Sequence, residues 1–172
     1  MRQVADETLL SRPYNGFQRD AESLRTWLVN ALPSNVFALN DHNFVEVVLK
    51  GTTPWVVDFY APWCGPCQTF AVDFELAAKM LDGRVRFAKV NCDVYYYTCQ
   101  SAGIRAYPSV RLYPGRTGWN LQETSGIPFA GERRNAEDVA AWIEEILAQT
   151  ASSAFQQSAQ HAANAFQSHD EL

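Results

Sequence analysis

Two cysteines separated by two residues, Cys64 and Cys67, are the side chains of this sequence best suited to carry chemistry. Thiols at this spacing can form a disulfide with each other, and a thiolate is the nucleophile of disulfide exchange. Cys64 directly precedes a predicted helix, whose first turn has unpaired N–H groups and a partial positive charge that favour a thiolate. The pattern predicts a redox site in which an exposed Cys64 attacks a substrate disulfide and a shielded Cys67 resolves the mixed disulfide.

The segment before the cysteines predicts a strand at the centre of a sheet. Residues 55–60, WVVDFY, are apolar on both alternating sides, as in a strand that is covered on both faces. Asp58 then points into the interior, where desolvation raises the pKa of a carboxyl group and lets it act as a base near neutral pH. After the cysteines, apolar residues from Phe70 to Leu81 recur at helical spacing and predict a long helix.

At this point the sequence resembles the thioredoxin fold. Residues 58–67, DFYAPWCGPC, match the thioredoxin and protein disulfide isomerase pattern of strand, buried acid, tryptophan and Cys-Gly-Pro-Cys. The resemblance implies an α/β fold with a central mixed sheet flanked by helices on both faces. It also implies that Asp58 relays a proton to and from Cys67, that Lys89 is the partner of Asp58, and that Trp63 helps to bind substrate.

A second stretch extends the resemblance. Residues 103–113, GIRAYPSVRLY, resemble the isomerase motif GVRGYPT, whose proline follows a cis peptide bond beside the cysteines. Pro108 is then that proline, which lacks a backbone donor, and Tyr107 offers its backbone for strand-like pairing with a substrate peptide. Arg105 matches the arginine with which isomerases tune the second cysteine, although an ordinary surface charge is the other interpretation.

Composition and charge exclude several classes of partner. The 172 residues are 47% hydrophobic, which is enough for one ordinary core, and the net charge of −5 offers no basic surface for nucleic acid or anionic lipid. No apolar run approaches the roughly 18 residues of a membrane span, and the first 13 residues lack the apolar centre of a signal peptide. We therefore expect neither nucleic acid nor a membrane as a partner.

The sequence ends in HDEL, formed by His169, Asp170, Glu171 and Leu172, which is the retrieval signal of the endoplasmic reticulum. This signal predicts the lumen of that compartment as the location and the retrieval receptor as a partner. Entry into the lumen needs a further signal, so the sequence is expected to be part of a longer chain. Residues 150–172 are rich in Ala, Gln and Ser, and we expect a flexible tail, partly helical because alanine favours helix.

An internal repeat links the two ends of the chain. Residues 14–32 align without gaps on residues 129–147, at an offset of 115 positions, and six aligned positions are identical. Because this offset is about the length of one thioredoxin domain, residues 1–33 are expected to be the last strand and helix of a preceding module, and residues 34–149 a complete domain. The alternative is that two unrelated amphipathic helices after glycine turns look alike.

Turn and cap signals predict the remaining elements. We expect a first strand over 36–39, a short helix over 41–49 capped by Asp41, and a strand over 85–90. A glycine-containing loop over 114–128 should precede an edge strand over 128–130 and a last helix capped by Asn135.

Cys92 and Cys99 form the second pair of cysteines, seven residues apart. The oxidising compartment favours a structural disulfide between them, with two free thiols as the alternative, because spacing alone does not prove connectivity. A zinc site built on either pair is disfavoured because no histidine lies close in sequence to them. No metal or other cofactor is expected.

Together these features resemble the last thioredoxin domain of the J-domain-containing disulfide reductases of the endoplasmic reticulum, within the protein disulfide isomerase family. The resemblance implies reduction of disulfides in misfolded client proteins, and a lumenal Hsp70 as a partner only through a J domain, which these residues do not show. The uncharged Gly65 and Pro66 favour reduction, since the thioredoxin pair is more reducing than the isomerase pair by roughly 90 mV. An oxidase or isomerase module and a mainly client-binding module stay open as alternatives.

Overall fold

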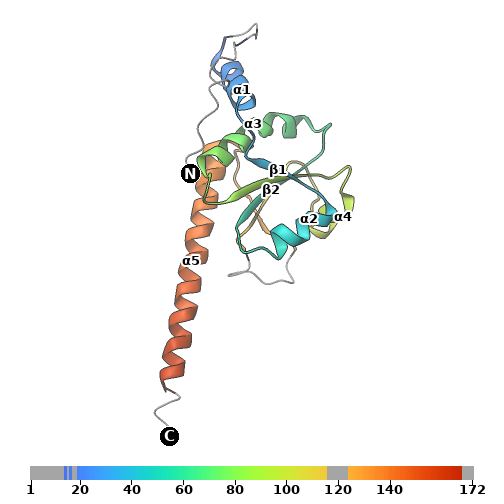
Figure 1. Cartoon of the computed structure of the whole chain (residues 1–172). Helices are drawn as coiled ribbons and strands as arrows, with labels where there is room; N and C mark the ends of the chain where they lie inside the picture. The colour runs from blue at the N-terminus through green and yellow to red at the C-terminus, as the bar shows by residue number, and fades with distance from the viewer. Residues whose placement is uncertain (1–13, 15, 17–18, 116–123, 168–172) are drawn as a thin grey trace.

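A mixed five-stranded sheet forms the centre of the molecule (Figure 1). The computed structural model describes the chain except residues 1–13, 15, 17–18, 116–123 and 168–172, so the HDEL signal and most of the predicted loop lie outside the described residues. The strands are β1 (Val36–Leu39), β2 (Trp55–Tyr60), β3 (Arg86–Asn91), β4 (Ser109–Tyr113) and β5 (Ile127–Pro128), in the order β1-β3-β2-β4-β5. β1 and β2 run parallel to β3, whereas β4 runs antiparallel to β2 and β5.

Helices cover both faces of this sheet. They are α1 (Ala21–Ala31), α2 (Asp41–Asn43) with the π-helical turn η2 (Phe44–Leu49), α3 (Gly65–Met80), α4 (Tyr96–Ser101) and α5 (Ala136–Gln167). α3 and α5 pack on one face through residues such as Phe74 and Ile143, and η2 and α4 pack on the other through residues such as Phe44 and Cys99. The predicted α/β fold with a mixed sheet covered on both faces is confirmed.

β2 is the most buried strand because it lies at the middle of the sheet. Val56 belongs to the apolar cluster under α3 and α5, and Val57 and Phe59 belong to the cluster on the other face. All three side chains are fully buried. Burying one such side chain contributes about 1.5–3 kcal/mol, so the apolar run fixes both the position of β2 and the place where the strand ends at the cysteines.

Several predicted boundaries differ from the structure. The side chain of Asn40, not Asp41, caps α2, because its Oδ1 accepts the N–H groups of His42 and Asn43. The strand expected over 85–90 begins and ends one residue later, and the edge strand expected over 128–130 covers only Ile127 and Pro128. Within the described part of the chain, no helix is both long enough and apolar enough to cross a membrane.

Residues 150–167 are helical where we expected a flexible tail, and residues 168–172 lie outside the described residues. α5 begins with Asn135 as its cap, since Asn135 Oδ1 accepts the Asp138 N–H at 2.7 Å, and then runs for 32 residues without a break. Figure 1 shows its second half leaving the body of the molecule. Alanine and glutamine, which are frequent in this segment, have high helix propensity. We expected this propensity to make the segment only partly helical. The expected domain limits at residues 33 and 149 stay predictions.

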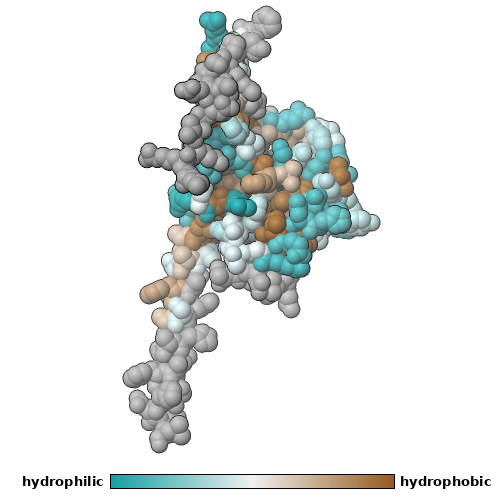
Figure 2. All heavy atoms as spheres, in the orientation of Figure 1, coloured by the Kyte–Doolittle hydropathy of each residue, from teal (hydrophilic) through white to brown (hydrophobic). Residues whose placement is uncertain are grey.

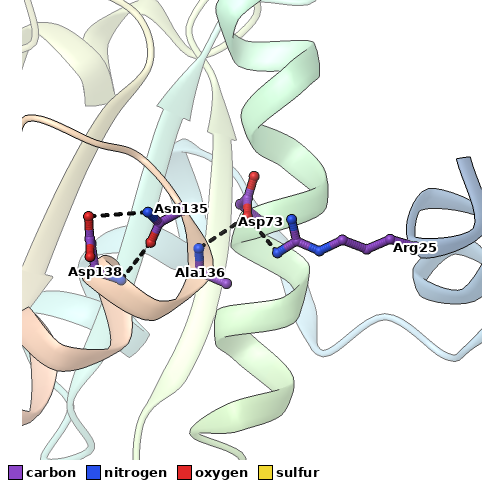
Figure 3. A network of polar contacts seen from close by, with 5 residues as sticks. All are labelled: Arg25, Asp73, Asn135, Ala136 and Asp138. Carbon is purple, nitrogen blue, oxygen red and sulfur yellow. Dashed lines mark hydrogen bonds and ion pairs between the residues drawn. The ribbon is translucent and has the colours of Figure 1, made fainter. Parts of the chain in front are cut away.

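A polar junction on α3 joins α1 to the start of α5 (Figure 3). Asp73 Oδ1 accepts a hydrogen bond from the Ala136 N–H at the start of α5, at 3.1 Å, and from Arg25 of α1, at 2.8 Å. Two more groups of α3 hold the segment that follows α1: Lys79 donates to the Pro33 carbonyl at 2.6 Å, and Glu75 accepts from the Ser34 hydroxyl at 2.5 Å. α1 is therefore fastened to α3 by polar contacts.

The two copies of the internal repeat have the same local geometry. The ring of Tyr14 packs edge-on against Trp27, with ring centroids 5.7 Å apart, and the ring of Phe129 packs in the same way against Trp142 at 5.2 Å. In each copy the first ring lies so close to the glycine two residues later that a Cβ there would come within 2.3 Å of it. The helix caps also correspond, since Asp20 accepts the Ser23 N–H at the position of Asn135. These matches support a shared origin over chance similarity.

Only the second copy buries its apolar face. Val139 and Ile143 of α5 are fully buried, whereas Leu24 and Leu28, which occupy the same repeat positions in α1, are 41% and 52% exposed. Figure 2 shows apolar residues in separate patches across one face of the molecule, with polar residues between them. The uncovered face of α1 supports the proposal that residues 1–33 are the end of a preceding module.

We expect α1 to open more readily than the domain it touches, because few buried apolar contacts hold it and local stability follows such contacts. In native-state hydrogen exchange, its amides should exchange faster than those of α3. Arg25→Gln should accelerate exchange in α1 alone, while Arg19→Gln, an exposed control on the same segment, should leave it unchanged. Protection of α1 equal to that of α3 would contradict this expectation.

Candidate active site

Cys64 stands at the junction of β2 and α3. The central strand ends at Tyr60, and Cys64 is the N-cap of α3, with extended backbone (φ −77°, ψ 107°). Its Sγ accepts the backbone N–H of Cys67 at 3.3 Å. Pro66 fits in the first turn because no intrahelical hydrogen bond is lost there. The cap position places the sulfur at the positive end of α3, where a thiolate is stabilised.

Cys64 and Cys67 are joined in a disulfide, with their Cα atoms 5.2 Å apart. The expected contrast between an exposed Cys64 and a shielded Cys67 is wrong in degree, because the residues are only 6% and 3% exposed. Both pack against Ala61 and the rings of Tyr60 and Tyr107. Little of the Cys64 surface is therefore accessible to a substrate disulfide.

Aromatic side chains lie beside the cysteine pair. The indole of Trp63 is 70% exposed, and its ring packs edge-on against Tyr107 with centroids 6.1 Å apart. Pro108 is buried, and the peptide bond between Tyr107 and Pro108 is cis, as the resemblance implied. Trp63 and Tyr107, two of the three residues predicted to bind substrate, thus lie beside the cysteine pair. An exposed indole beside a buried disulfide can pack on apolar residues of a bound polypeptide.

Asp58 lies on the face of the sheet that α3 covers. It is 5% exposed, and it follows Val56 by two residues, so both side chains point under α3 and α5. Burial raises the pKa of its carboxyl group to about 7, while the positive charges of Lys89 and Arg134 act in the opposite direction with less effect. This carboxyl group can therefore take up and release a proton near neutral pH, as the chemistry of Cys67 requires.

The remaining predicted site residues are exposed or lie on the opposite face of the sheet. Lys89 is the register partner of Asp58 on β3, and its side chain is exposed, so it affects Asp58 by charge. Arg105 is also exposed, and within the described residues it makes no hydrogen bond or ion pair, so its tuning of Cys67 stays a prediction. Cys92 and Cys99 form a second disulfide with Cα atoms 5.8 Å apart, in the apolar cluster on the opposite face of the sheet.

Three residues near Asp58 were missed by the sequence analysis. Burial and the charge of Asp58 both raise the pKa of Tyr60. Arg134 acts on Asp58 from the segment before α5, and no sequence signal indicates this contact. Glu75 lines the same pocket as Asp58, and it follows Cys67 by two steps of four residues along α3, a spacing that keeps side chains on one side of a helix.

Metal binding finds no support in the described part of the chain. No group of three or more His, Cys, Asp or Glu side chains is placed there so that it could hold an ion. All four cysteines are engaged in disulfides.

Comparison with known proteins gives the same fold, and some of the relatives are much more similar to this chain than others. Residues 35–145 match the family described as Thioredoxin. A mouse protein named DnaJ homolog subfamily C member 10 is 60% identical over 100 residues, which are 58% of this chain and 13% of that protein. Protein disulfide-isomerase 2-3 of Arabidopsis thaliana is 30% identical over 69% of this chain and 26% of its own length. The chain thus spans a small part of these relatives.

A solved structure matches at the level of one domain. The crystal structure of the Trx4 domain of ERdj5 is 49% identical, with a TM-score of 0.57, and the match covers 67% of this chain and 97% of that domain. Nearly the whole of that domain therefore finds its counterpart in this chain.

The raised pKa of Asp58 predicts a specific pH dependence of stability. In the unfolded chain the carboxyl group ionises near 3.8, and in the folded protein near 7, so the folded state loses stability as the pH rises between these values. Asp58→Asn removes this effect. At pH 8 its free energy of unfolding should exceed that of the wild type by up to about 4 kcal/mol, and the difference should shrink toward pH 4.

Urea unfolding of the oxidised protein between pH 4 and pH 8 measures this difference directly. Asp93→Asn, which removes an exposed carboxyl group, is the matched control and should give a difference that does not grow with pH. A difference for Asp58→Asn that is flat across this range would show that the Asp58 carboxyl group is ionised in the folded protein well below pH 7.

Proposed function

This chain belongs to the thioredoxin family, and we propose that it is a thiol-disulfide oxidoreductase that reduces disulfides of client proteins. The observation that carries the proposal is the Cys64–Cys67 disulfide at the start of α3, directly after the exposed indole of Trp63 and after the strand that buries the Asp58 carboxyl group. The first group can bind a polypeptide and the second can move a proton, while the cysteines exchange electrons.

Reduction of a client takes two exchange steps. The Cys64 thiolate attacks one sulfur of the client disulfide, a mixed disulfide forms, and the first client sulfur leaves as a thiolate that takes a proton from water. The Asp58 carboxylate then accepts the proton of the Cys67 thiol. The Cys67 thiolate attacks the Cys64 sulfur, and the second client sulfur leaves and is protonated.

Two electrons have then passed from the cysteine pair to the client, and the Cys64–Cys67 disulfide has formed. A dithiol or other thiol reductant must reduce this disulfide before the next cycle.

Two features support the reducing direction. Gly65 and Pro66 place no positive charge between the cysteines, where the isomerase dipeptide carries a histidine that stabilises the reduced state. The mouse relative and the Trx4 domain are also much more similar to this chain than the disulfide isomerase from Arabidopsis thaliana is. An oxidase or isomerase module is the second candidate. The similarity to the disulfide isomerase from Arabidopsis thaliana favours it, because that similarity is weaker but covers 69% of this chain.

We place the protein in the lumen of the endoplasmic reticulum. The terminal HDEL sequence and the similarity to ERdj5 support this location, and the retrieval receptor that reads HDEL would be a partner. The name of the mouse relative assigns it to the DnaJ family. A J domain of that family would provide the contact with a lumenal Hsp70. That partnership belongs to a longer chain with a J domain, since these 172 residues show none.

The two cysteines should behave differently when one is removed. With Cys67→Ala, a client disulfide attacked by Cys64 finds no resolving thiol, so a mixed disulfide should accumulate to near stoichiometric amounts. Cys64→Ala should trap at least about tenfold less, because Cys67 lies inside α3 and lacks the N-cap position that stabilises a thiolate on Cys64. Insulin mixed with each reduced variant, alkylated and separated without reductant, gives the measurement.

A double variant, Cys92→Ala with Cys99→Ala, is the matched control and should turn over insulin without trapping it. Equal trapping by both single variants would overturn the assigned roles of the two cysteines. Trapping by neither would leave a client-binding module as the better description.

A further inference from the structure

A pocket of about 160 Å³ lies between the sheet and α3, behind the redox site. Its polar lining consists of Asp58 from β2, Lys89 from β3 and Glu75 from α3. Ala71, Val72 and Phe74 of α3 complete the wall with Val36 of β1. The pocket therefore connects the buried carboxyl group of the site with a second carboxyl group that is itself half-buried.

Two oxygen atoms in this pocket are sequestered from solvent and lack a protein partner. Asp58 Oδ1 and Glu75 Oε2 have no hydrogen bond to any described residue. The other oxygen of Glu75 accepts from the Ser34 hydroxyl at 2.5 Å, which fixes the carboxylate in place. Because a buried oxygen without a partner is unfavourable, and because a polar pocket of this volume has room for several waters, water is its natural partner.

The proposed reaction requires a path by which Asp58 can lose a proton. In each reducing cycle Asp58 receives a proton from Cys67 and must lose it before the next cycle. A client bound at the exposed indole of Trp63 would cover the Cys64 side of the site, and Cys67 and Asp58 are both buried. The proton therefore needs a route that leaves the site on the side away from the client.

We propose that Glu75 provides this route as a proton-exchange residue between Asp58 and solvent. This inference rests on the proposed role of Asp58. After Cys67 has formed its bond to Cys64, protonated Asp58 passes its proton through water in the pocket to the Glu75 carboxylate. Glu75 then releases it to bulk solvent, and both carboxylates return to their starting state with no change in electron count.

The charges around the pocket are consistent with this direction. Lys89 and Arg134 are the cations that act on Asp58, and both favour its ionised form once the proton has left. Tyr60 is the other titratable group that interacts with Asp58. Its hydroxyl group remains protonated because burial and the charge of Asp58 raise its pKa above the ordinary value of a tyrosine. Glu75 is thus the acidic group best placed to receive the proton within the described part of the pocket.

Glu75→Gln in the full chain tests the proposal, because glutamine keeps the shape and can still accept from Ser34 but cannot carry the proton. Reduced protein is mixed with insulin and an excess of a dithiol reductant, the reaction is stopped with acid at set times, and the mixed disulfide is followed by mass spectrometry. Under multiple turnover at pH 7 we expect a rate about tenfold lower, with an unchanged first exchange step. Imidazole or acetate added as a small proton carrier should restore most of the rate.

The controls separate this proposal from the proposed function. Glu46→Gln removes an exposed carboxyl group on the opposite side of the sheet and should keep the wild-type rate. Glu75→Asp should keep part of the rate, and a thermal unfolding profile shows whether each variant is folded.

Each outcome bears on one assignment. Slowing by Asp58→Asn together with a wild-type rate for Glu75→Gln would overturn the role of Glu75 alone. A loss of rate in Glu75→Gln that no proton carrier restores would also overturn it, since a structural defect is not rescued by buffer. A wild-type rate in Asp58→Asn would instead remove the relay on which the proposal rests.

Discussion

The burial of one carboxyl group, that of Asp58, is the constraint on which the rest of the site depends. Desolvation raises its pKa to about 7, which costs the folded protein stability at neutral pH and makes the group useful as a base. The apolar side chains of β2, including Val56, Val57 and Phe59, hold the strand in the middle of the sheet and so keep Asp58 there. The same strand delivers Cys64 to the start of α3.

The two faces of the sheet differ in their side chains and in the roles that these side chains can have. The face under α3 and α5 contains Asp58, the pocket with Glu75 and the junction at Asp73, so the attachment of α1 and the proposed proton transfer both depend on α3. The opposite face is apolar and is closed by the Cys92–Cys99 disulfide. A covalent link on that face can stabilise the domain, and its cysteines belong to a different apolar cluster from Cys64 and Cys67.

The sequence reveals the parts of the site that local patterns specify. The alternation of β2 predicts the burial of Asp58, and the Cys-Gly-Pro-Cys motif predicts Cys64 as a helix cap, because both follow from neighbouring residues. Features that depend on distant segments escape this reasoning. Tyr107 packs against the cysteine cluster from the segment before β4, and the sequence gives no sign that Glu75 lines the same pocket as Asp58.

The central claim is that the Cys64–Cys67 pair works as a reductant, and its redox potential tests that claim most directly. Equilibration of the protein with glutathione buffers of known ratio, followed by alkylation and mass spectrometry, gives the potential of this pair separately from Cys92 and Cys99. With no positive charge between the cysteines, we expect a value nearer to about −270 mV, as in thioredoxin, than to about −180 mV, as in protein disulfide isomerase. A potential at or above about −180 mV would contradict the account and favour the oxidase or isomerase alternative.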